Sequence, residues 1–377
     1  MTRAVAEVDL SAIAANLDVV AERAGSAQVM AVVKADGYGH GMLPVARAAR
    51  AHGVPWLGVA LPSEALALRA AGDTGQVLAW LWTPGDPGVD ACVAEAVDLS
   101  VSTTWALAEV VAAARHHGTA ARIHVKVDTG LSRNGAGPAE WPAVLGAVAR
   151  ACADGSVRLV ALWTHFADAD TPGAGSVATQ RARFAEAVAA TAAAGLRPDL
   201  QHLSNSGGLW AHPDLRGDLV RTGIAMYGLT PARALGSAAG LGLVPAMTLR
   251  SALANTKVVG PGTGVSYGHA WSTRSTTTLG LVPLGYADGI PRAASGRVEV
   301  AIAGRRHRLV GRVAMDQFVV DLGSNAAEAG APVVLFGPGR SGEPTADEWA
   351  GAMGTIGYEV VTRIGPRVPR AYVGGAA

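Results

Sequence analysis

The sequence predicts an α/β fold: a (β/α)8 barrel of the TIM type followed by a mainly β domain. Three observations lead to this prediction. The chain has 377 residues, more than one ordinary domain needs. Short β-branched runs alternate with alanine-rich stretches from residue 27 to about residue 223, as in repeated β-α units. After Pro231 the pattern changes to period-2 stretches, so we place the barrel at residues 10–232 and the β domain at residues 233–377.

Eight strand candidates occupy the first region, and each is a short run rich in Val, Leu or Ile. In a (β/α)8 barrel, the chemistry lies at the C-terminal ends of these strands. An open, doubly wound sheet is the competing architecture, and the pattern alone separates the two only modestly. The candidates are residues 28–33, 56–60, 76–81, 99–102, 122–127, 157–163, 200–204 and 218–223.

The second region contains period-2 stretches that are broken by Gly and Pro turns, with few helical patterns between them. No internal repeat or long charged linker separates it from the first region, so the two domains are expected to pack together. The stretches are residues 248–259, 276–284, 297–302, 307–313 and 317–322.

Composition and charge exclude several classes of protein. The chain has 31 basic and 30 acidic residues and no long basic run, which argues against nucleic-acid binding. The apolar stretch of residues 233–250 is short and broken by Gly and Pro, so no membrane span is expected. The N-terminal residues do not resemble a signal peptide, and Cys92 and Cys152 suit two buried thiols in a reducing cytoplasm. No metal site is predicted.

Lys34 is the first candidate for chemistry. It follows an apolar strand in the motif AVVKADGYGHG, residues 31–41. A lysine at the edge of the core is desolvated, which lowers its pKa and makes the neutral amine available for a Schiff base. Its position alone is more typical of a surface lysine at a strand end, and the rest of the motif is what favours the functional interpretation.

Tyrosine usage gives a second indication. Five of the six tyrosines are next to a glycine, which is unusual for core packing and suggests that their hydroxyls are directed at a ligand. Loop tyrosines that cap the core with the phenol in water are the alternative. The five are Tyr38, Tyr227, Tyr267, Tyr286 and Tyr358.

An ordered set of motifs resembles the bacterial alanine racemases along nearly the whole chain. The motifs are AVVKADGYGHG, DTGLSRNG, WTHFADAD, HLSNSGG, VRTGIAMYGL, GVSYGHAW, GYADG, GRVAMDQ and RIGPRVPR. The resemblance implies an isomerase that interconverts L-alanine and D-alanine, with a barrel that binds pyridoxal 5'-phosphate. It also implies that residues 1–9 join the β domain.

The resemblance assigns the two catalytic bases. Lys34 resembles the lysine that holds the cofactor and then acts on one face of the substrate, and Tyr267 resembles the tyrosine that acts on the opposite face. A racemase needs two such groups, because a proton removed from one face must be returned to the other. In the family this tyrosine comes from the partner subunit, which implies a homodimer with shared active sites.

Arg221 resembles the arginine that hydrogen-bonds the pyridine nitrogen of the cofactor. A cation there disfavours protonation of the ring and weakens the electron sink. His165 resembles the histidine that joins Arg221 in a network near the tyrosine base. Such a network is needed because the ordinary pKa of tyrosine, near 10, makes it a poor base at neutral pH. A structural salt bridge is the alternative role for Arg221.

Further residues match cofactor and substrate positions of the family. A backbone and hydroxyl site for the phosphate is implied at Tyr38, Asn205, Ser206, Gly223, Ile224 and Tyr358. The substrate region is implied at Arg133, Met315, Asp316 and Tyr286, and Lys126 matches a lysine that is carbamylated in some members. Without the resemblance, residues 205–208 also read as an ordinary helix start, and His116 and His117 read as surface residues at a helix end.

Two other readings stay open. A broader amino-acid racemase of the same fold would share most of these motifs, whereas a decarboxylase is disfavoured because it would need an acid at the position of Arg221. A non-catalytic pyridoxal-phosphate carrier would not need the β domain. Supply of D-alanine for peptidoglycan follows from the resemblance only.

Overall fold

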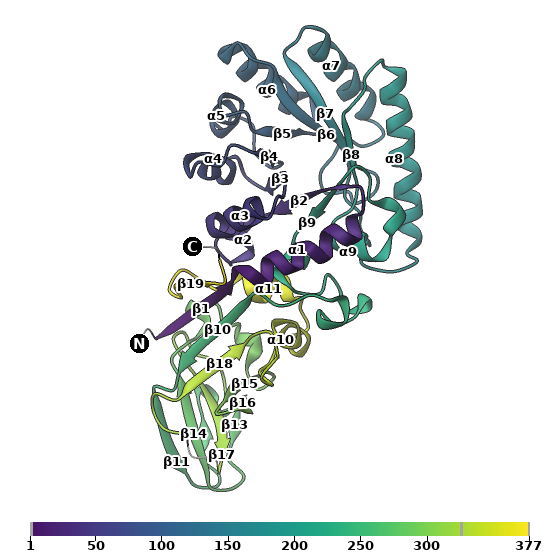
Figure 1. The fold of residues 1–377 in the computed structure, drawn as a ribbon. Coiled ribbons are helices and arrows are strands. Elements are labelled where there is room, and N and C mark those ends of the chain that lie inside the picture. Colours follow the sequence, from purple (N-terminus) through teal and green to yellow (C-terminus); the bar gives the residue numbers. More distant parts are fainter. Residues whose placement is uncertain (1–2, 325–326, 376–377) are drawn as a thin grey trace.

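The computed structural model describes residues 3–324 and 327–375. Figure 1 shows a barrel of strands and helices at one end of the molecule and a β-rich part at the other. The long first helix, α1, lies across the junction between the two parts. The predicted class, a barrel followed by a mainly β domain, is confirmed.

The barrel strands run parallel to one another in the order β8-β7-β6-β5-β4-β3-β2-β9. All eight predicted strands are present, since each candidate run overlaps one of them. Their apolar side chains are buried, as expected for a parallel sheet that is covered by helices. The bounds are β2 Gln28–Val32, β3 Trp56–Val59, β4 Gln76–Ala79, β5 Asp98–Val101, β6 Ala121–Lys126, β7 Val157–Trp163, β8 Leu200–His202 and β9 Leu219–Thr222.

The barrel closes between β8 and β9 without a regular ladder. Isolated bridges join His202 to Gly217 and Asn205 to Arg221. The backbone N–H of Arg221 donates to the carbonyl of Ser204 at 3.0 Å. This seam therefore depends on a few contacts, and Arg221 takes part in two of them.

Helices follow the barrel strands and cover the outside of the barrel (Figure 1). Side-chain caps explain several of their start points: Asp9 accepts the N–H groups of Ser11 and Ala12 at α1, and Thr103 accepts that of Ala106 at α6. The bounds are α1 Leu10–Ala24, α2 Lys34–Tyr38, α3 Met42–Ala51, α4 Pro62–Ala70, α5 Gly88–Ala94, α6 Thr104–His117, α7 Trp141–Ala153, α8 Gly175–Ala193 and α9 Ser206–Ala211.

The β-rich part is a nine-stranded sheet in the order β11-β14-β17-β16-β15-β18-β10-β1-β19. The first strand of the chain, β1, lies in this sheet between β10 and β19. A separate antiparallel pair, β12 and β13, holds between its strands the loop that contains Tyr267. The bounds are β1 Ala4–Asp9, β10 Met247–Ala252, β11 Asn255–Val259, β12 Gly264–Val265, β13 Trp271–Ser272, β14 Thr277–Val282, β15 Glu299–Ile302, β16 Arg305–Val310, β17 Phe318–Gly323, β18 Pro332–Phe336 and β19 Arg370–Val373.

The sequence pattern missed some features of this part. The stretch at residues 248–259 forms two strands, because the N–H of Leu253 donates to Ala331 and that of Ala254 donates to Leu281, which redirects the chain. Strand β18 and the helices α10 (Ala346–Met353) and α11 (Gly357–Thr362) were not among the predicted elements. Single turns of 3-10 helix lie at Pro213–Leu215, Ile224–Tyr227, Arg233–Leu235, Ala239–Leu241, Tyr267–His269, Tyr286–Asp288 and Arg292–Ala294.

The composition predicts two buried cysteines and no membrane-spanning helix. Cys92 is buried but Cys152 is partly exposed, and both are free thiols, so the expectation of two buried thiols holds for Cys92 alone. In the described part of the chain, no helix combines the length and the apolar character that crossing a membrane requires.

One buried amide joins the first helix to the segment that leaves the barrel. Asn16 on α1 is fully buried. Its Nδ2 donates to the carbonyls of Met226 at 3.2 Å and Val244 at 2.9 Å. Its Oδ1 accepts the N–H of Val244 at 2.8 Å. A single side chain therefore satisfies three backbone groups.

We expect Asn16→Ala to lower the free energy of unfolding by about 3 kcal/mol, because buried backbone groups are left without partners. Urea denaturation at a fixed protein concentration measures the change. Glu22→Ala, at an exposed position on the same helix, is the control and is expected to shift the free energy by less than about 0.5 kcal/mol. Equal midpoints for the two variants would contradict the assignment.

Candidate active site

A cavity of about 660 Å³ opens at the C-terminal ends of the barrel strands. The loops that follow β2, β4, β6, β7, β8 and β9 all contribute to its lining, as expected for a barrel enzyme. Most of the predicted site residues meet there: Lys34, Tyr38, Lys126, Arg133, His165, Asn205, Ser206, Arg221, Gly223, Ile224 and Tyr358.

The backbone after Lys34 forms a left-handed turn, which is the element drawn as α2. The φ angles are 52° at Ala35, 51° at Asp36, 61° at Gly37 and 54° at Tyr38. Residues other than glycine are disfavoured in this region by roughly 1–2 kcal/mol each. Strain of this kind persists only where surrounding contacts fix the conformation, and it is common at functional sites.

Contacts from several elements fix this turn. The carboxylate of Glu64 on α4 accepts the N–H of Ala35 at 2.7 Å, and Asp36 accepts the N–H of Met42 at 2.9 Å. The carbonyl of Gly39 accepts a hydrogen bond from Arg370 near the C-terminus at 3.0 Å. A Cβ at Gly39 would collide with the carbonyl oxygen of Val361. The turn that presents Lys34 is therefore clamped by both parts of the molecule.

Lys34 has the electrostatic surroundings that the sequence predicts. Burial, followed by repulsion from Arg133, lowers the pKa of its amine below the usual value. The amine lies 5.6 Å from the ring of Trp80, on the cavity wall. A larger fraction of Lys34 is therefore neutral, and available as a nucleophile or base, than for a lysine in water.

The cavity carries an excess of positive charge. Lys34, Lys126, Arg133 and Arg221 all line it, and no Asp or Glu is among the described residues of its wall. Burial and repulsion from Arg221 and Arg133 lower the pKa of Lys126 to about 8. Such a cavity favours a ligand with several negative charges.

Arg221 lies on the cavity wall and is only 4% exposed. Its Nη1 donates to Nδ1 and the carbonyl of His202, both at 2.9 Å. Its Nη2 donates to the carbonyls of Thr164 and Leu203, both at 2.8 Å. No partner for its Nε–H occurs among residues 3–324 and 327–375. One donor is thus left for a ligand. Burial lowers the pKa of Arg221 to about 9, so it stays a cation at neutral pH.

His165 also faces the cavity, and its Nδ1 lies 3.3 Å from Nη2 of Arg221. Burial, followed by repulsion from Arg221 and Lys126, lowers the pKa of His165 to about 2. It is therefore a neutral hydrogen-bond acceptor at physiological pH. The positive charge of the network lies on the arginines and lysines.

Hydroxyl and backbone groups gather beside Arg221. The Oγ of Ser206 accepts the N–H of Gly223 at 3.0 Å, and Asn205 caps α9 by accepting the N–H of Gly208 at 2.9 Å. Tyr38 lies on the same wall with Tyr358, at a ring separation of 6.2 Å. Burial raises the pKa of both phenols, so they remain protonated donors.

The other predicted site residues lie outside this cavity, in the β-rich part. Tyr267 is 69% exposed, Met315 is 53% exposed and Tyr286 is 45% exposed, and Asp316 is also exposed. Their loops lie together: the N–H of Tyr286 donates to the carbonyl of Ala314, and Ser266 donates to the carbonyl of Arg312. The structure thus brings these side chains to one surface, apart from Lys34.

Several residues of the wall were not predicted. Trp80 and Leu81 follow β4 directly, whereas the sequence analysis placed them at the end of the strand predicted at residues 76–81, and Trp163 ends β7. Lys126 and Arg221 lie 4.4 Å and 4.9 Å from the Trp163 ring. Trp80 and Trp163 both lie at the end of a predicted strand, and this position is the sequence signal that could have identified them as cavity residues. Asn134 and Thr362 also line the wall.

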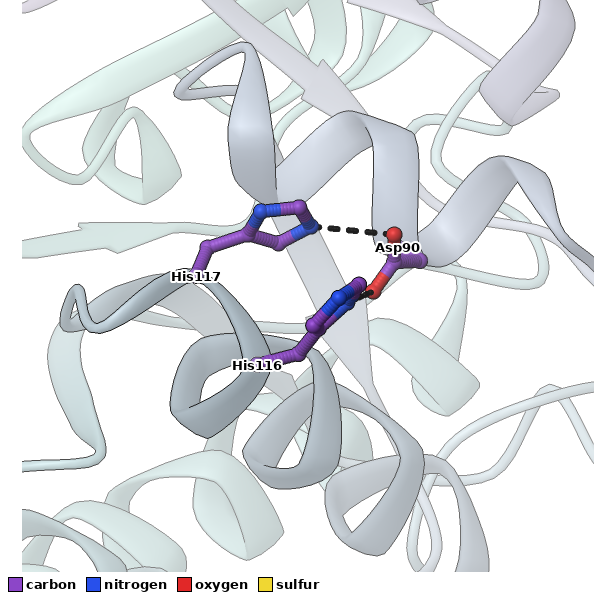
Figure 2. A group of neighbouring side chains, drawn as sticks. All are labelled: Asp90, His116 and His117. Carbon is purple, nitrogen blue, oxygen red and sulfur yellow. Dashed lines mark hydrogen bonds and ion pairs between the residues drawn. The ribbon is translucent and has the colours of Figure 1, made fainter.

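His116 and His117, predicted as surface residues at a helix end, do lie in the last turn of α6. The structure adds a partner that the sequence did not indicate. Figure 2 shows both imidazoles directed at the carboxylate of Asp90 on α5. The distances are 2.9 Å from His116 Nδ1 to Oδ1 and 2.9 Å from His117 Nε2 to Oδ2.

Comparison with known proteins agrees with this architecture. Residues 8–231 match the family model described as the N-terminal domain of alanine racemase, and residues 246–372 match its C-terminal domain. The chain is 54% identical over 376 residues to a Streptomyces coelicolor protein named alanine racemase, covering 98% of this chain and 96% of that protein. It is 53% identical over 371 residues to a Frankia casuarinae protein of the same name, with the same coverage.

The fold is also similar to solved structures. The crystal structure of alanine racemase from D-cycloserine producing Streptomyces lavendulae superposes with a TM-score of 0.98 at 52% sequence identity. The similarity covers 100% of this chain and 98% of that one. A likeness of this extent includes both parts of the molecule.

The pKa of Lys126 can be measured directly, because the chain contains only three lysines, Lys34, Lys126 and Lys257. In buffer free of carbon dioxide, NMR of 13C-lysine-labelled protein should show one signal that titrates near pH 8 and is missing in Lys126→Gln. Exposed Lys257 serves as the internal reference. A midpoint for Lys126 near the ordinary lysine value of about 10.4 would contradict the charge analysis.

Proposed function

The chain belongs to the alanine racemase family, and from this membership we propose that it interconverts L-alanine and D-alanine with pyridoxal 5'-phosphate as cofactor. The observation that carries the proposal is the cavity in which Lys34 and Arg221 meet. It combines a lysine of lowered pKa with a surplus of cations and no carboxylate among its described lining residues.

The donor set fits this cofactor. Lys34 would hold it covalently, and the unpartnered Nε–H of Arg221 would donate to the pyridine nitrogen. The phosphate, a dianion, suits a wall that supplies hydroxyls and backbone N–H groups as well as cations. Its proposed ligands are Tyr38, Asn205, Ser206, Gly223, Ile224 and Tyr358.

When bound, the cofactor withdraws electrons from the substrate and makes its α-proton acidic. The side chains then need only move that proton. The neutral amine of Lys34 accepts it on one face, and the phenol of Tyr267 from the partner subunit donates a proton on the other face. For the reverse reaction the two groups exchange roles.

Arg221 and His165 support this proton transfer without carrying the proton themselves. The cation of Arg221 disfavours a proton on the pyridine nitrogen. The neutral imidazole of His165 accepts from Arg221 on Nδ1, so its Nε2–H is the group that would donate a hydrogen bond to the oxygen of the tyrosine base. Arg133 supplies the cation for the substrate carboxylate. The proposed roles of Lys34, Arg221 and Arg133 thus account for three of the four cations that line the cavity.

We infer a head-to-tail homodimer from the placement of the second base. Tyr267 is exposed on the β-rich part, where its loop lies beside those of Tyr286 and Met315. Tyr267 does not line the cavity that holds Lys34 of its own chain, so it would not act there as the second base. In the dimer, Tyr267, Tyr286, Met315 and Asp316 complete the partner's cavity, so that each site is built from two subunits.

Lys126 is proposed as a carbamylated residue. Carbon dioxide adds to a neutral amine, and a pKa of about 8 leaves a share of Lys126 neutral at physiological pH. The resulting carbamate is an anion among Arg221, Arg133 and Lys34, where it would offset part of the repulsion. Adding bicarbonate to the NMR sample should therefore remove the Lys126 titration.

We place the enzyme in the cytoplasm, supplying D-alanine for peptidoglycan.

Complementation between two inactive variants tests the shared site. We expect Lys34→Ala to lose turnover and the absorbance of bound cofactor, and Tyr267→Phe to keep the absorbance but lose roughly a hundredfold or more of the rate, unequally in the two directions. Co-expressed, they should recover about a quarter of wild-type activity, because half the dimers are mixed and each has one intact site.

The readout is a chiral assay of L-alanine conversion. Mixing the two purified homodimers without subunit exchange is the control and should recover nothing. If the co-expressed pair stays inactive while mixed dimers are present, Tyr267 does not act across the interface. If wild-type protein racemises serine or lysine faster than alanine, the substrate assignment fails while the mechanism stands.

A further inference from the structure

Four buried polar side chains form a line across the inside of the barrel, from Asp98 to Arg221. The carboxylate of Asp98 lies 3.0 Å from Nε2 of His124. Nδ1 of His124 lies 3.0 Å from Nε2 of His202, and Nδ1 of His202 lies 2.9 Å from Nη1 of Arg221. Only the last of these residues reaches the cavity wall.

The residues of the line are buried. Asp98 is 1% exposed, and both histidines are fully buried. The residues come from four strands, β5, β6, β8 and β9, so the line crosses the barrel interior. Trp163 stacks on His202 at 5.3 Å, and Trp56 packs edge-on against His124 at 5.3 Å. Burying four polar groups among apolar ones is costly unless every donor meets an acceptor.

One assignment of protons satisfies every contact. Arg221 has no acceptor atom, so it must donate to Nδ1 of His202. The proton of His202 is then on Nε2 and points at Nδ1 of His124. The proton of His124 is then on Nε2 and points at Asp98, which is ionised. All protons point in one direction, and both histidines are neutral.

The charges agree with this order. Burial, followed by the charge of Arg221, lowers the pKa of His202 well below the usual value, so it stays neutral. Burial alone would raise the pKa of Asp98, but hydrogen bonds from His124 and Arg122 outweigh it and keep the carboxylate ionised. Arg221 itself has no carboxylate among its hydrogen-bond partners. Asp98 is paired directly with Arg122, whose Nε donates to it at 2.6 Å, and is connected to Arg221 through two imidazoles.

We propose that Asp98 and His124 are positioning residues for the racemisation: through His202 they orient Arg221 so that its Nε–H alone remains for the cofactor. This inference rests on the proposed function. Reversing the proton order would place a proton on Nδ1 of His202, opposite the N–H of Arg221, and would push the guanidinium away. An aspartate that fixes a histidine tautomer acts in the same way in hydrolases.

The proton order can be read without any variant. In the holoenzyme with 15N-labelled histidine, NMR at neutral pH should show the proton of His124 and that of His202 on Nε2. In Asp98→Asn, where the amide can donate as well as accept, the two histidines should show a mixture of tautomers. A proton on Nδ1 of either histidine in the wild type would overturn the proposal.

Kinetic measurements distinguish a role of Asp98 in positioning Arg221 from a role in stabilising the fold alone. Asp98→Asn should lose at least about tenfold in kcat with KM for L-alanine changed less than twofold, and should shift the absorbance of bound cofactor. His307→Asn is the control, since His307 is buried in the β-rich part and, among the described residues, its side chain is hydrogen-bonded to the carbonyl of Asp321 alone. Unchanged kcat in folded, cofactor-bound Asp98→Asn would refute the proposal. If the wild type itself does not racemise alanine, the proposed function fails, and the tautomer spectra still decide the proton order.

A second, independent feature is the group of Asp90, His116 and His117 on the outside of the barrel (Figure 2). One carboxylate oxygen and two imidazole nitrogens all lie within 4.8 Å of one another. Tetrahedral zinc with bonds of about 2.0–2.1 Å spaces its ligand atoms roughly 3.3 Å apart. The two Asp–His distances of 2.9 Å therefore need only a small opening to admit an ion.

The ligand types point to a class of ion. Imidazole and carboxylate together suit zinc and neighbouring transition metals, whereas calcium and magnesium prefer oxygen ligands alone. His116 is 70% exposed, which leaves room for water to complete the coordination. We propose that Asp90, His116 and His117 bind one divalent transition metal ion such as zinc at the protein surface.

Calorimetric titration of the holoenzyme with zinc chloride tests this site. We expect one saturable zinc per chain, weakened at least about tenfold in His116→Asn and in Asp90→Asn. His52→Asn is the matched control, because His52 is a partly exposed histidine that bonds a single carboxylate, Asp18, at 2.8 Å. Binding that is absent in the wild type, or equal in wild type and His116→Asn, would refute the site.

Discussion

The guanidinium of Arg221 must find its hydrogen-bond acceptors inside the barrel, because burial removes the water that would otherwise solvate its charge. It finds them at the ends of β7 and β8, on the carbonyls of Thr164, His202 and Leu203. Strand β8 borders the irregular seam with β9, so the same side chain that faces the cavity also links β9 across that seam. The closure of the barrel and the chemistry of the cavity therefore both depend on the hydrogen bonds of the Arg221 guanidinium. A neutral residue there would leave three carbonyls without a donor as well as removing the charge.

The charge of Arg221 shapes the rest of the cavity. With no carboxylate on the described wall, each added cation raises the cost of the others, and Lys34 and Lys126 respond by holding their protons less tightly. Anions relieve this repulsion, and a phosphate and a substrate carboxylate are anions. The positive charge of the cavity is therefore balanced only when anionic ligands are bound. The carboxylate of Asp98 is paired with Arg122 and set back behind two imidazoles, which leaves the cavity wall to the ligand.

The barrel was predictable because short runs rich in Val, Leu and Ile recur between alanine-rich stretches, and Lys34 was predictable because a charged residue ends such a run. The second domain was predicted only in outline, since period-2 patterns do not reveal that Leu253 and Ala254 redirect the chain. The line from Asp98 to Arg221 was missed for a different reason. His124 and His202 sit inside apolar strands, and a lone buried histidine has no sequence signature until its partner is placed beside it. Contacts between distant strands, such as β6 and β8, are a property of barrel closure, which no local pattern encodes.

The left-handed turn after Lys34 shows why the two parts of the chain must fold as one. Four consecutive residues with φ above 50° would relax in isolation. Glu64 holds the turn from the barrel side, whereas Arg370 and the backbone at Val361 hold it from the side of the second part. Tyr358, on α11 of that second part, also lines the cavity. The lysine is therefore presented by a strained loop whose restraints come partly from residues more than 300 positions away. A barrel without the C-terminal part would keep its strands but release this turn, so the β-rich part contributes to the site of its own chain.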